Sequence, residues 1–225
     1  MTKRYFITGT DTNVGKTLAA CALLQAAISI GYHAAGYKPV ATGYQLTLDG
    51  PRNNDALALL SNSNVILSYS QVNPLVFSEP TSPHIACRAE GRNIELSELS
   101  AGLKVIEQKS DWIVVEGAGG WFTPLGEGIL YSDWVNYEKL PVILVIGMKL
   151  GCINHALLTA LAIRQFGLQL VGWIANHIQP TTTWSQHYLA ELRNRLDAPL
   201  IGDIPWLSNI PVALLAKYIN LAELS

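Results

Sequence analysis

The stretch GTDTNVGKT, residues 9–17, is one residue longer than the usual phosphate-binding loop. That loop has four residues between its first glycine and Gly-Lys-Thr, whereas five separate Gly9 from Gly15 here. A short β-rich run, RYFIT (residues 4–8), precedes it, and a long apolar segment, KTLAACALLQAAISI (residues 16–30), follows it. Strand, glycine loop and buried helix form the order that phosphate binding requires. We interpret the stretch as a variant phosphate-binding loop.

The residue types in this loop suit a nucleotide. Backbone N–H groups ahead of a helix N-terminus bind phosphate oxygens, and Gly15 lets the backbone approach them closely. Lys16 would add a point charge to the phosphates, and the Thr17 hydroxyl would bind Mg²⁺. The alternative is a helix that begins after a glycine turn with no ligand. The flanking strand and long apolar helix favour the nucleotide site.

The rest of the chain alternates between predicted strands and helices. Apolar strands are predicted at residues 33–40, 111–120, 140–147, 170–177 and 198–205. Helices are predicted to begin near Asp55 and to span residues 95–108, 153–166 and 183–196. Unbroken apolar strands are typical of a parallel sheet covered on both faces. We therefore expect an α/β fold of the P-loop NTPase type, a doubly wound, mostly parallel sheet flanked by helices, as a single domain over residues 1–225.

The amino-acid composition limits the classes of molecule that the chain is expected to bind. With 15 basic and 17 acidic residues and a pI of about 6.2, the chain has no basic footprint for nucleic acid or an anionic membrane. No signal peptide or membrane-spanning run is predicted, and the cysteines Cys21, Cys87 and Cys152 fit neither a disulfide framework nor a zinc site. We expect a cytoplasmic protein that binds small molecules.

Two carboxylates are candidates for a metal site opposite the loop. Ligands of doubly wound sheets gather at the carboxyl ends of the strands, and Glu116 closes the predicted strand WIVVEG there. Asp55, at the start of a helix, could reach the same edge, although an acid that stabilises the first helical turn is an equal explanation. The sequence thus indicates a site for a magnesium-bound nucleotide.

Six motifs together resemble the dethiobiotin synthetase family. They are GTDTNVGKT, GYKPVATG, EPTSPHIA, VEGAGGWFTPL, KLGCINHALLTA and GDIPWL, in the family's order, and the similarity extends to the C-terminal KYINLAEL. The resemblance implies an ATP-dependent ligase that carboxylates 7,8-diaminononanoate with CO₂. The carbamate would be phosphorylated by ATP, and the second amine would close the ring to give dethiobiotin, ADP and phosphate.

The resemblance also implies roles for individual residues. The catalytic groups would be Lys38, Lys16 and Thr12, with Mg²⁺ held by Thr17, Asp55 and Glu116. The nucleotide would be bound by Asn13, Val14, Gly15, Lys16, Thr17, Leu18, Asp55, Glu116, Gly117, Ala118, Gly119, Asn176, His177, Pro205, Trp206 and Leu207. The diamine would be bound by Thr42, Ser82, Gly151, Cys152, Ile153, Asn154 and Tyr188. The last five would come from the neighbouring subunit of a homodimer whose active site spans the interface.

Several of these residues have simpler explanations in the sequence. Asn154 can cap a helix, Trp206 can belong to the core, and Ser82 lies in a proline-rich turn where His84 is better explained as structural. The chain also departs from the family at Asn13, His177 and Val212, where acidic residues are common. All three changes remove negative charge around the nucleotide, so we expect weaker or altered nucleotide discrimination with the chemistry retained.

A nucleotide-driven dimeric switch ATPase of related fold is the main alternative function. Such proteins usually carry a second lysine early in the phosphate loop, and GTDTNVG has none. The C-terminal LLAKYINLAELS has a single lysine and no basic face, so it is predicted to form a packed last helix and not a membrane anchor.

Overall fold

A computed structural model describes residues 2–206 and 214–224 of the chain. Its centre is a six-stranded, wholly parallel sheet in the order β12-β11-β10-β1-β7-β2. The strands are β1 (Lys3–Gly9), β2 (Ala34–Tyr37), β7 (Trp112–Gly120), β10 (Val142–Gly147), β11 (Leu170–Asn176) and β12 (Leu200–Ile204). The order reverses direction at β1, so the phosphate loop that follows β1 lies at the point where doubly wound sheets bind ligands. The predicted fold class is confirmed.

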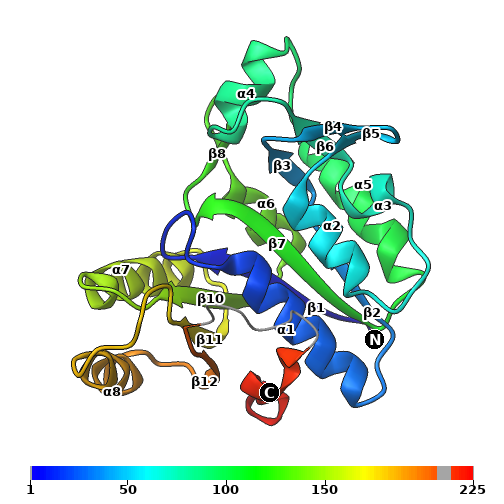
Figure 1. Cartoon of the computed structure of the whole chain (residues 1–225). Helices are drawn as coiled ribbons and strands as arrows, with labels where there is room; N and C mark the ends of the chain where they lie inside the picture. The colour runs from blue at the N-terminus through cyan, green and yellow to red at the C-terminus, as the bar shows by residue number, and fades with distance from the viewer. Residues whose placement is uncertain (1, 207–213, 225) are drawn as a thin grey trace.

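Helices cover both faces of the sheet, as Figure 1 shows. Alternation along β10 separates the two layers: Ile143 and Val145 belong to the core beneath α1 (Lys16–Ser29) and α2 (Asn54–Ser61). Leu144 and Ile146 belong to the core beneath α7 (Cys152–Gln165) and α8 (Ser185–Arg195). The second layer continues with α5 (Leu96–Glu107) and α6 (Tyr131–Glu138). Burial on both faces explains why these strands read as unbroken apolar runs.

Smaller elements surround the carboxyl edge of the sheet. They are β3 (Val40–Thr42) paired with β6 (Leu75–Phe77), the hairpin of β4 (Gln45–Thr47) and β5 (Gly50–Arg52), the hairpin of β8 (Pro124–Gly126) and β9 (Ile129–Leu130), and the short helices α3 (Tyr69–Val72) and α4 (Pro83–Ala89). The strand predicted at residues 33–40 is shorter than expected: β2 ends at Tyr37, and Val40 already belongs to β3. Lys38 therefore lies in the bend between two strands of different sheets.

The prediction of a last helix is wrong. The C-terminal segment forms two short 3₁₀ turns, Ala216–Tyr218 and Leu221–Glu223. Between them Ile219 bridges Gly202, and the Asn220 N–H donates to the Ile201 carbonyl at 2.8 Å. Pairing with β12 takes the backbone groups that a continuous helix would use. The segment is packed as expected, since Leu215 and Leu224 are buried. In the described part of the chain, no helix has the length and apolar character to span a bilayer.

Candidate active site

The phosphate loop is held open by left-handed backbone and by Asn176. Asn13 and Gly15 have φ angles of 59° and 87°, and a Cβ on Gly15 would lie 2.0 Å from Asn176 Nδ2. That amide donates to the Val14 carbonyl at 2.8 Å, while the Val14 side chain is buried in the core. The loop therefore presents backbone toward its interior, and Asn176, predicted as a nucleotide-base ligand, also supports the loop.

Lys16 is a buried ammonium with little compensation from the protein. Its Nζ donates to the Asp11 carbonyl of the same loop at 3.0 Å. Burial, followed by repulsion from Lys38, lowers the pKa of Lys16 to about 8. An anion bound in the loop would give the Lys16 ammonium the negatively charged partner that it lacks.

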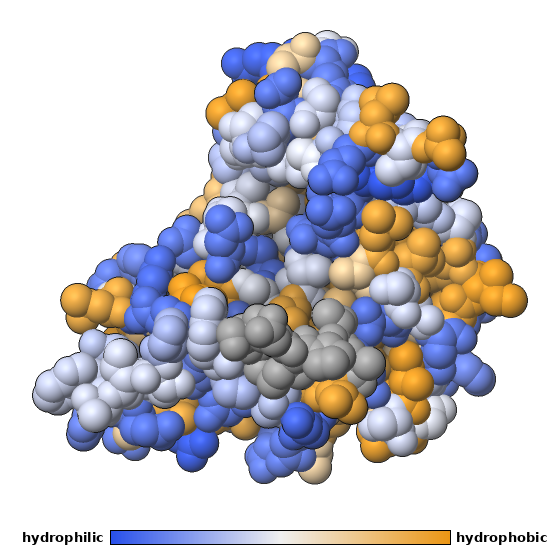
Figure 2. All heavy atoms as spheres, viewed as in Figure 1, coloured by the Kyte–Doolittle hydropathy of each residue, from blue (hydrophilic) through white to orange (hydrophobic). Residues whose placement is uncertain are grey.

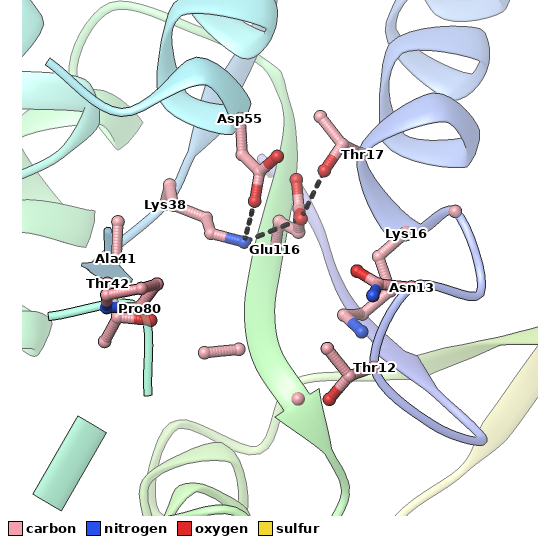
Figure 3. Close-up of a pocket in the computed structure, with 13 residues that line it drawn as sticks. Thr12, Asn13, Lys16, Thr17, Lys38, Ala41, Thr42, Asp55, Pro80 and Glu116 are labelled. Carbon is pink, nitrogen blue, oxygen red and sulfur yellow. Dashed lines mark hydrogen bonds and ion pairs between the residues drawn. The ribbon is translucent and has the colours of Figure 1, made fainter. Parts of the chain in front are cut away.

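Lys38, Asp55, Glu116 and Thr17 converge from separate elements on one point (Figure 3). Lys38 Nζ lies 2.7 Å from Glu116 Oε1 and 3.2 Å from Asp55 Oδ2, and it also donates to the Gly117 carbonyl at 3.1 Å. The Thr17 hydroxyl donates to the same Glu116 Oε1 at 2.8 Å. The metal ligands and the catalytic lysine predicted from the sequence thus form one cluster. Asp55 pairs with Lys38 in this cluster, so it does more than stabilise the first turn of its helix.

Charge and burial act in opposite directions in this cluster. Burial alone would lower the pKa of Lys38, but Glu116 and Asp55 outweigh it, and the pKa of Lys38 is raised. Burial would raise the pKa of Asp55, but Lys38 holds it below its usual value. For the fully enclosed Glu116, burial exceeds the effect of Lys38 and the carboxyl pKa is raised. A further cation at this point would relieve the buried Glu116 charge.

The donor set fits Mg²⁺. Glu116 Oε2 is buried without a hydrogen-bond partner, so one carboxylate oxygen is free to ligate. Residues 2–206 and 214–224 contain no cluster of three or more His, Cys, Asp or Glu side chains that would form an all-protein metal cage. Mg²⁺ is usually bound by one or two carboxylates together with substrate phosphates and water. Thr17, Asp55 and Glu116 match that requirement.

A cavity of about 570 Å³ opens beside these groups. It is lined by Thr12, Asn13, Gly15, Lys16, Thr17, Lys38, Ala41, Thr42, Asp55, Pro80, Glu116, Ala118 and Gly119. A second cavity of about 330 Å³ extends the first to Ser82 and shares with it Thr12, Thr42, Pro80, Ala118 and Gly119. In Figure 2 the surface is indented between the α4 end of the molecule and the α7 end, with mostly hydrophilic residues around the indentation.

Other predicted ligands lie around this cavity or away from it. The side chain of Leu18 packs against the core, and the Gly117 carbonyl is occupied by Lys38. The Ser82 hydroxyl is hydrogen-bonded to His84 Nδ1 at 3.0 Å, in keeping with a structural His84. Trp206 is 43% exposed and thus not a core residue, and Leu207 and Val212 lie outside the described residues.

The proposed carboxylate-binding residues are not among those lining either cavity of their own chain. Gly151, with a φ of 93°, is the N-cap of α7, so the alternative of a cap by the Asn154 side chain is not what the structure has. Gly151 and Asn154 are exposed, and Tyr188 lies on α8. Lys149, just before this turn, pairs with Asp11 of the phosphate loop at 3.4 Å.

Sequence reasoning missed three contributors to the site. Asp11 supplies the carbonyl that holds Lys16, and Ala41 and Pro80 line the larger cavity. Asp11 lies within the quoted loop motif, but a contact made through its backbone leaves no trace in the residue type. Pro80 approaches through the β6–α4 connection, which only the tertiary fold brings near Lys38.

Comparison with known proteins identifies the family. A family model described as an AAA domain matches residues 3–211. The ATP-dependent dethiobiotin synthetase BioD 1 of Salmonella typhi is 59% identical over 225 residues, which cover 100% of this chain and 99% of the relative. The chain belongs to the dethiobiotin synthetase family. The family member of Escherichia coli strain K12 is 58% identical, with both chains covered completely.

Solved structures of distant proteins share the fold of this synthetase family member. A ParA family ATPase from Chlorobium tepidum superposes with a TM-score of 0.57 at 16% identity, covering 100% of this chain and 99% of that one. The MinC:MinD cell division complex of Aquifex aeolicus gives a TM-score of 0.55 at 14% identity, covering 97% of this chain and 87% of that one. At such identities the similarity concerns the fold alone.

Proposed function

We propose that this chain, acting as one domain, makes dethiobiotin from 7,8-diaminononanoate, CO₂ and ATP. One amine adds to CO₂ and loses a proton, giving a carbamate. A carbamate oxygen then takes the γ-phosphoryl group of ATP, and ADP leaves. The second amine attacks the carbamate carbon, the C–N bond closes the ring, and phosphate leaves with its bridging oxygen. Membership of the synthetase family and the composition of the cavity support this reaction.

The observation that carries the proposal is the pair of buried lysines on opposite sides of one cavity. Lys16 reaches in from the phosphate loop and Lys38 from the β2–β3 bend (Figure 3). Phosphoryl transfer to a carbamate brings two anions together, so the protein must position them and neutralise their charge. Lys16 would bind the γ-phosphate, Lys38 would bridge it to the carbamate, and Thr12 would donate to the transferred group. Thr42 and Ser82 would contact the diamine.

Thr17, Asp55 and Glu116 would hold Mg²⁺, which supplies charge neutralisation for the nucleotide phosphates when bound. In the structure Lys38 Nζ contacts both carboxylates. Asp55 and Glu116 would therefore give up part of their contact with Lys38 and bind Mg²⁺ in its place when the nucleotide enters. Lys38 would then be free to turn toward the carbamate.

The base of the nucleotide would lie beyond the phosphate loop, near Asn176 and the backbone of Pro205 and Trp206. His177 is buried there, and its Nε2 lies 3.0 Å from Asp203 Oδ1, so an acidic side chain is present although position 177 is histidine. We expect altered discrimination between nucleotides because the charge lies one strand away. Steady-state rates with ATP, CTP and GTP test this, and strict ATP preference with ordinary affinity would refute it.

The distant carboxylate of the diamine would bind the first turn of α7 in a second copy of the chain. The first N–H groups of a helix have no intrahelical partner and commonly bind an anion, and among residues 151–154, all of them described, only that of Cys152 is shown to be engaged, by the Lys149 carbonyl at 3.0 Å. Leu150, just before this helix, is 82% exposed, and Leu158 and Leu161 on the helix are 58% and 49% exposed. In Figure 2 apolar side chains gather at the α7 end of the molecule. These features support a homodimer that covers α7 and completes each active site, with Tyr188 as a further contact.

Phosphate release from Mg·ATP with bicarbonate, with and without 7,8-diaminononanoate, tests the reaction. The wild type should release phosphate only with the diamine, and Lys38→Gln, which is neutral but keeps a donor for Glu116, should lose most of that activity. Arg4→Gln, which removes a surface cation paired with Glu107, is the matched control and should remain active. Hydrolysis that ignores the diamine would favour the nucleotide-driven switch.

A further inference from the structure

Three of the proposed site residues lie on the elements between β2 and β6, outside both the central sheet and the phosphate loop. Lys38 follows β2, Thr42 ends β3, and Asp55 lies in the first turn of α2. All three line the side of the cavity away from the phosphate loop (Figure 3). Their relative positions must therefore be set by contacts among short elements.

Asn53 connects two of these elements. Its side chain is buried, and Oδ1 accepts from the N–H groups of Asp55 and Ala56 at 3.0 and 3.3 Å. Its Nδ2 donates to the carbonyls of Thr42 and Gly43, both at 3.2 Å. One amide thus caps the helix that carries Asp55 and holds the end of the strand that carries Thr42.

Asn73 holds the third residue. It is 2% exposed, and its Nδ2 donates to the Lys38 carbonyl at 2.7 Å and to the Leu75 carbonyl at 3.1 Å. The Lys38 N–H donates to the Val72 carbonyl at 2.8 Å. The end of α3 therefore fixes both backbone polar groups of Lys38 in the bend that Pro39 creates.

Tyr69 joins the two asparagines. Its hydroxyl donates to Asn73 Oδ1 at 2.9 Å and accepts from the Asn53 N–H at 2.7 Å. The Arg52 guanidinium lies over the ring, 4.3 Å from its centroid. None of the three residues lines either cavity of the site. Asn53 and Asn73 are buried and Tyr69 is partly buried, and a network whose members are all hydrogen-bonded has essentially one arrangement.

We propose that Asn53, Tyr69 and Asn73 form a positioning network that sets Lys38, Thr42 and Asp55 relative to one another for the ligase reaction. This rests on the roles proposed above for those three residues. Displacement of a reacting group by about 1 Å can cost on the order of a hundredfold in rate. The network does not touch the phosphate loop, so it should affect turnover and leave metal-free nucleotide binding by the loop intact.

Tyr69→Phe is the main test because it removes only the bridging hydroxyl and keeps the ring beneath Arg52. We expect kcat to fall about tenfold or more, with the affinity for ADP in the absence of Mg²⁺ within about twofold of the wild type. Tyr37→Phe is the matched control. It also removes a hydroxyl with a hydrogen bond, donated to the Leu99 carbonyl at 2.9 Å, from the residue next to Lys38, but on the side of α5.

Asn53→Ser separates positioning from helix capping. Serine is a comparable N-cap, so α2 keeps its cap while the Thr42 and Gly43 carbonyls lose their donor. We expect a KM for the diamine raised severalfold and an unchanged ADP affinity, with a melting temperature lowered only by the loss of these two hydrogen bonds. A lowered melting temperature with wild-type kinetics in both variants would mean that the network serves only stability.

The outcomes separate this inference from the proposed function. If Lys38→Gln is inactive while Tyr69→Phe and Tyr37→Phe have the same kcat, the positioning network is wrong and the ligase mechanism stands. If Lys38→Gln retains full diamine-dependent activity, the assignment of Lys38 fails first. Loss of kcat in Tyr69→Phe alone, with ADP binding retained, supports the network.

Discussion

Lys16 is a buried ammonium whose pKa of about 8 makes nucleotide binding sensitive to pH. Phosphate favours the charged form, so ADP binding above pH 8 should take up one proton. The affinity should fall by up to about tenfold per pH unit between roughly 8 and 10. Calorimetry of ADP binding at pH 8.5, in two buffers with different ionisation enthalpies, measures this uptake directly.

The same residue has a defined effect on unliganded stability. Its folded pKa lies below the ordinary value of 10.5, so the unfolded chain holds more protons between about pH 8 and 10.5, and the Lys16 term makes the protein more stable as pH rises through that window. In Lys16→Arg the side chain stays charged, so both the proton uptake and this stability term should vanish. Equal proton uptake in the variant would assign the titration to another group.

Glu116 should couple metal to nucleotide. Glu116→Gln keeps the side-chain shape and leaves Lys38 paired with Asp55, but it removes the buried charge and the free oxygen. In the wild type Mg²⁺ should strengthen ADP binding, and in Glu116→Gln this gain in affinity should be at least tenfold smaller. The ADP affinity without metal should be equal to that of the wild type or higher. Glu107→Gln, from a half-buried ion pair with Arg4, is the control. An undiminished Mg²⁺ effect in Glu116→Gln would place the ion elsewhere.

At the scale of elements, the start of α1 depends on the contact between Gly15 and Asn176. Gly15→Ala would be strained by its φ of 87° and would also meet Asn176 Nδ2 at 2.0 Å. Gly167 has a φ of 70° and open space around it, so Gly167→Ala has the backbone strain without the clash. We expect losses of about 1 kcal/mol at Gly167 and about 3 kcal/mol at Gly15 in urea denaturation.

A double-mutant cycle isolates the steric part. In an Asn176→Ala background, Gly15→Ala should cost only about 1 kcal/mol, because the clash is gone and the backbone strain remains. If the cost stays at its wild-type value, the two residues are not coupled, and the loop is limited by backbone conformation alone.

The central strands and the site carboxylates could be predicted because their patterns are local. A buried parallel strand is apolar throughout, and Glu116 interrupts that pattern within β7, just before the glycines that end the strand. The C-terminal turns and the Asn53–Tyr69–Asn73 network could not, because they depend on pairing between distant segments. Asn220, for example, takes its partner from Ile201. Of the three network residues, only Asn53 has a residue type and position that can indicate its role, as the N-cap of a helix.

At the scale of the whole molecule, the two groups of proposed ligands lie on surfaces of different kind. The proposed nucleotide ligands line a cavity, whereas Gly151 in the α7 turn and Leu158 and Leu161 on α7 are exposed. On the proposed roles, one chain would hold the nucleotide phosphates with its own residues, while its α7 turn would bind a substrate carboxylate only in another copy. A homodimer that brings α7 of one copy to the cavity of the other would make use of both.

Replacing Leu158 and Leu161 together with glutamate should give a monomer, because it places charge on the apolar face proposed to be buried. Sedimentation measures the mass. The monomer should bind ADP as the wild type does, while its KM for the diamine rises at least tenfold, because the α7 turn no longer meets the substrate carboxylate. Leu48→Glu is the matched control: Leu48 is fully exposed on the β4–β5 hairpin, and this variant should remain a dimer. A monomer with an unchanged KM would mean that each chain binds its substrate alone, and a double variant that stays dimeric would move the interface away from α7.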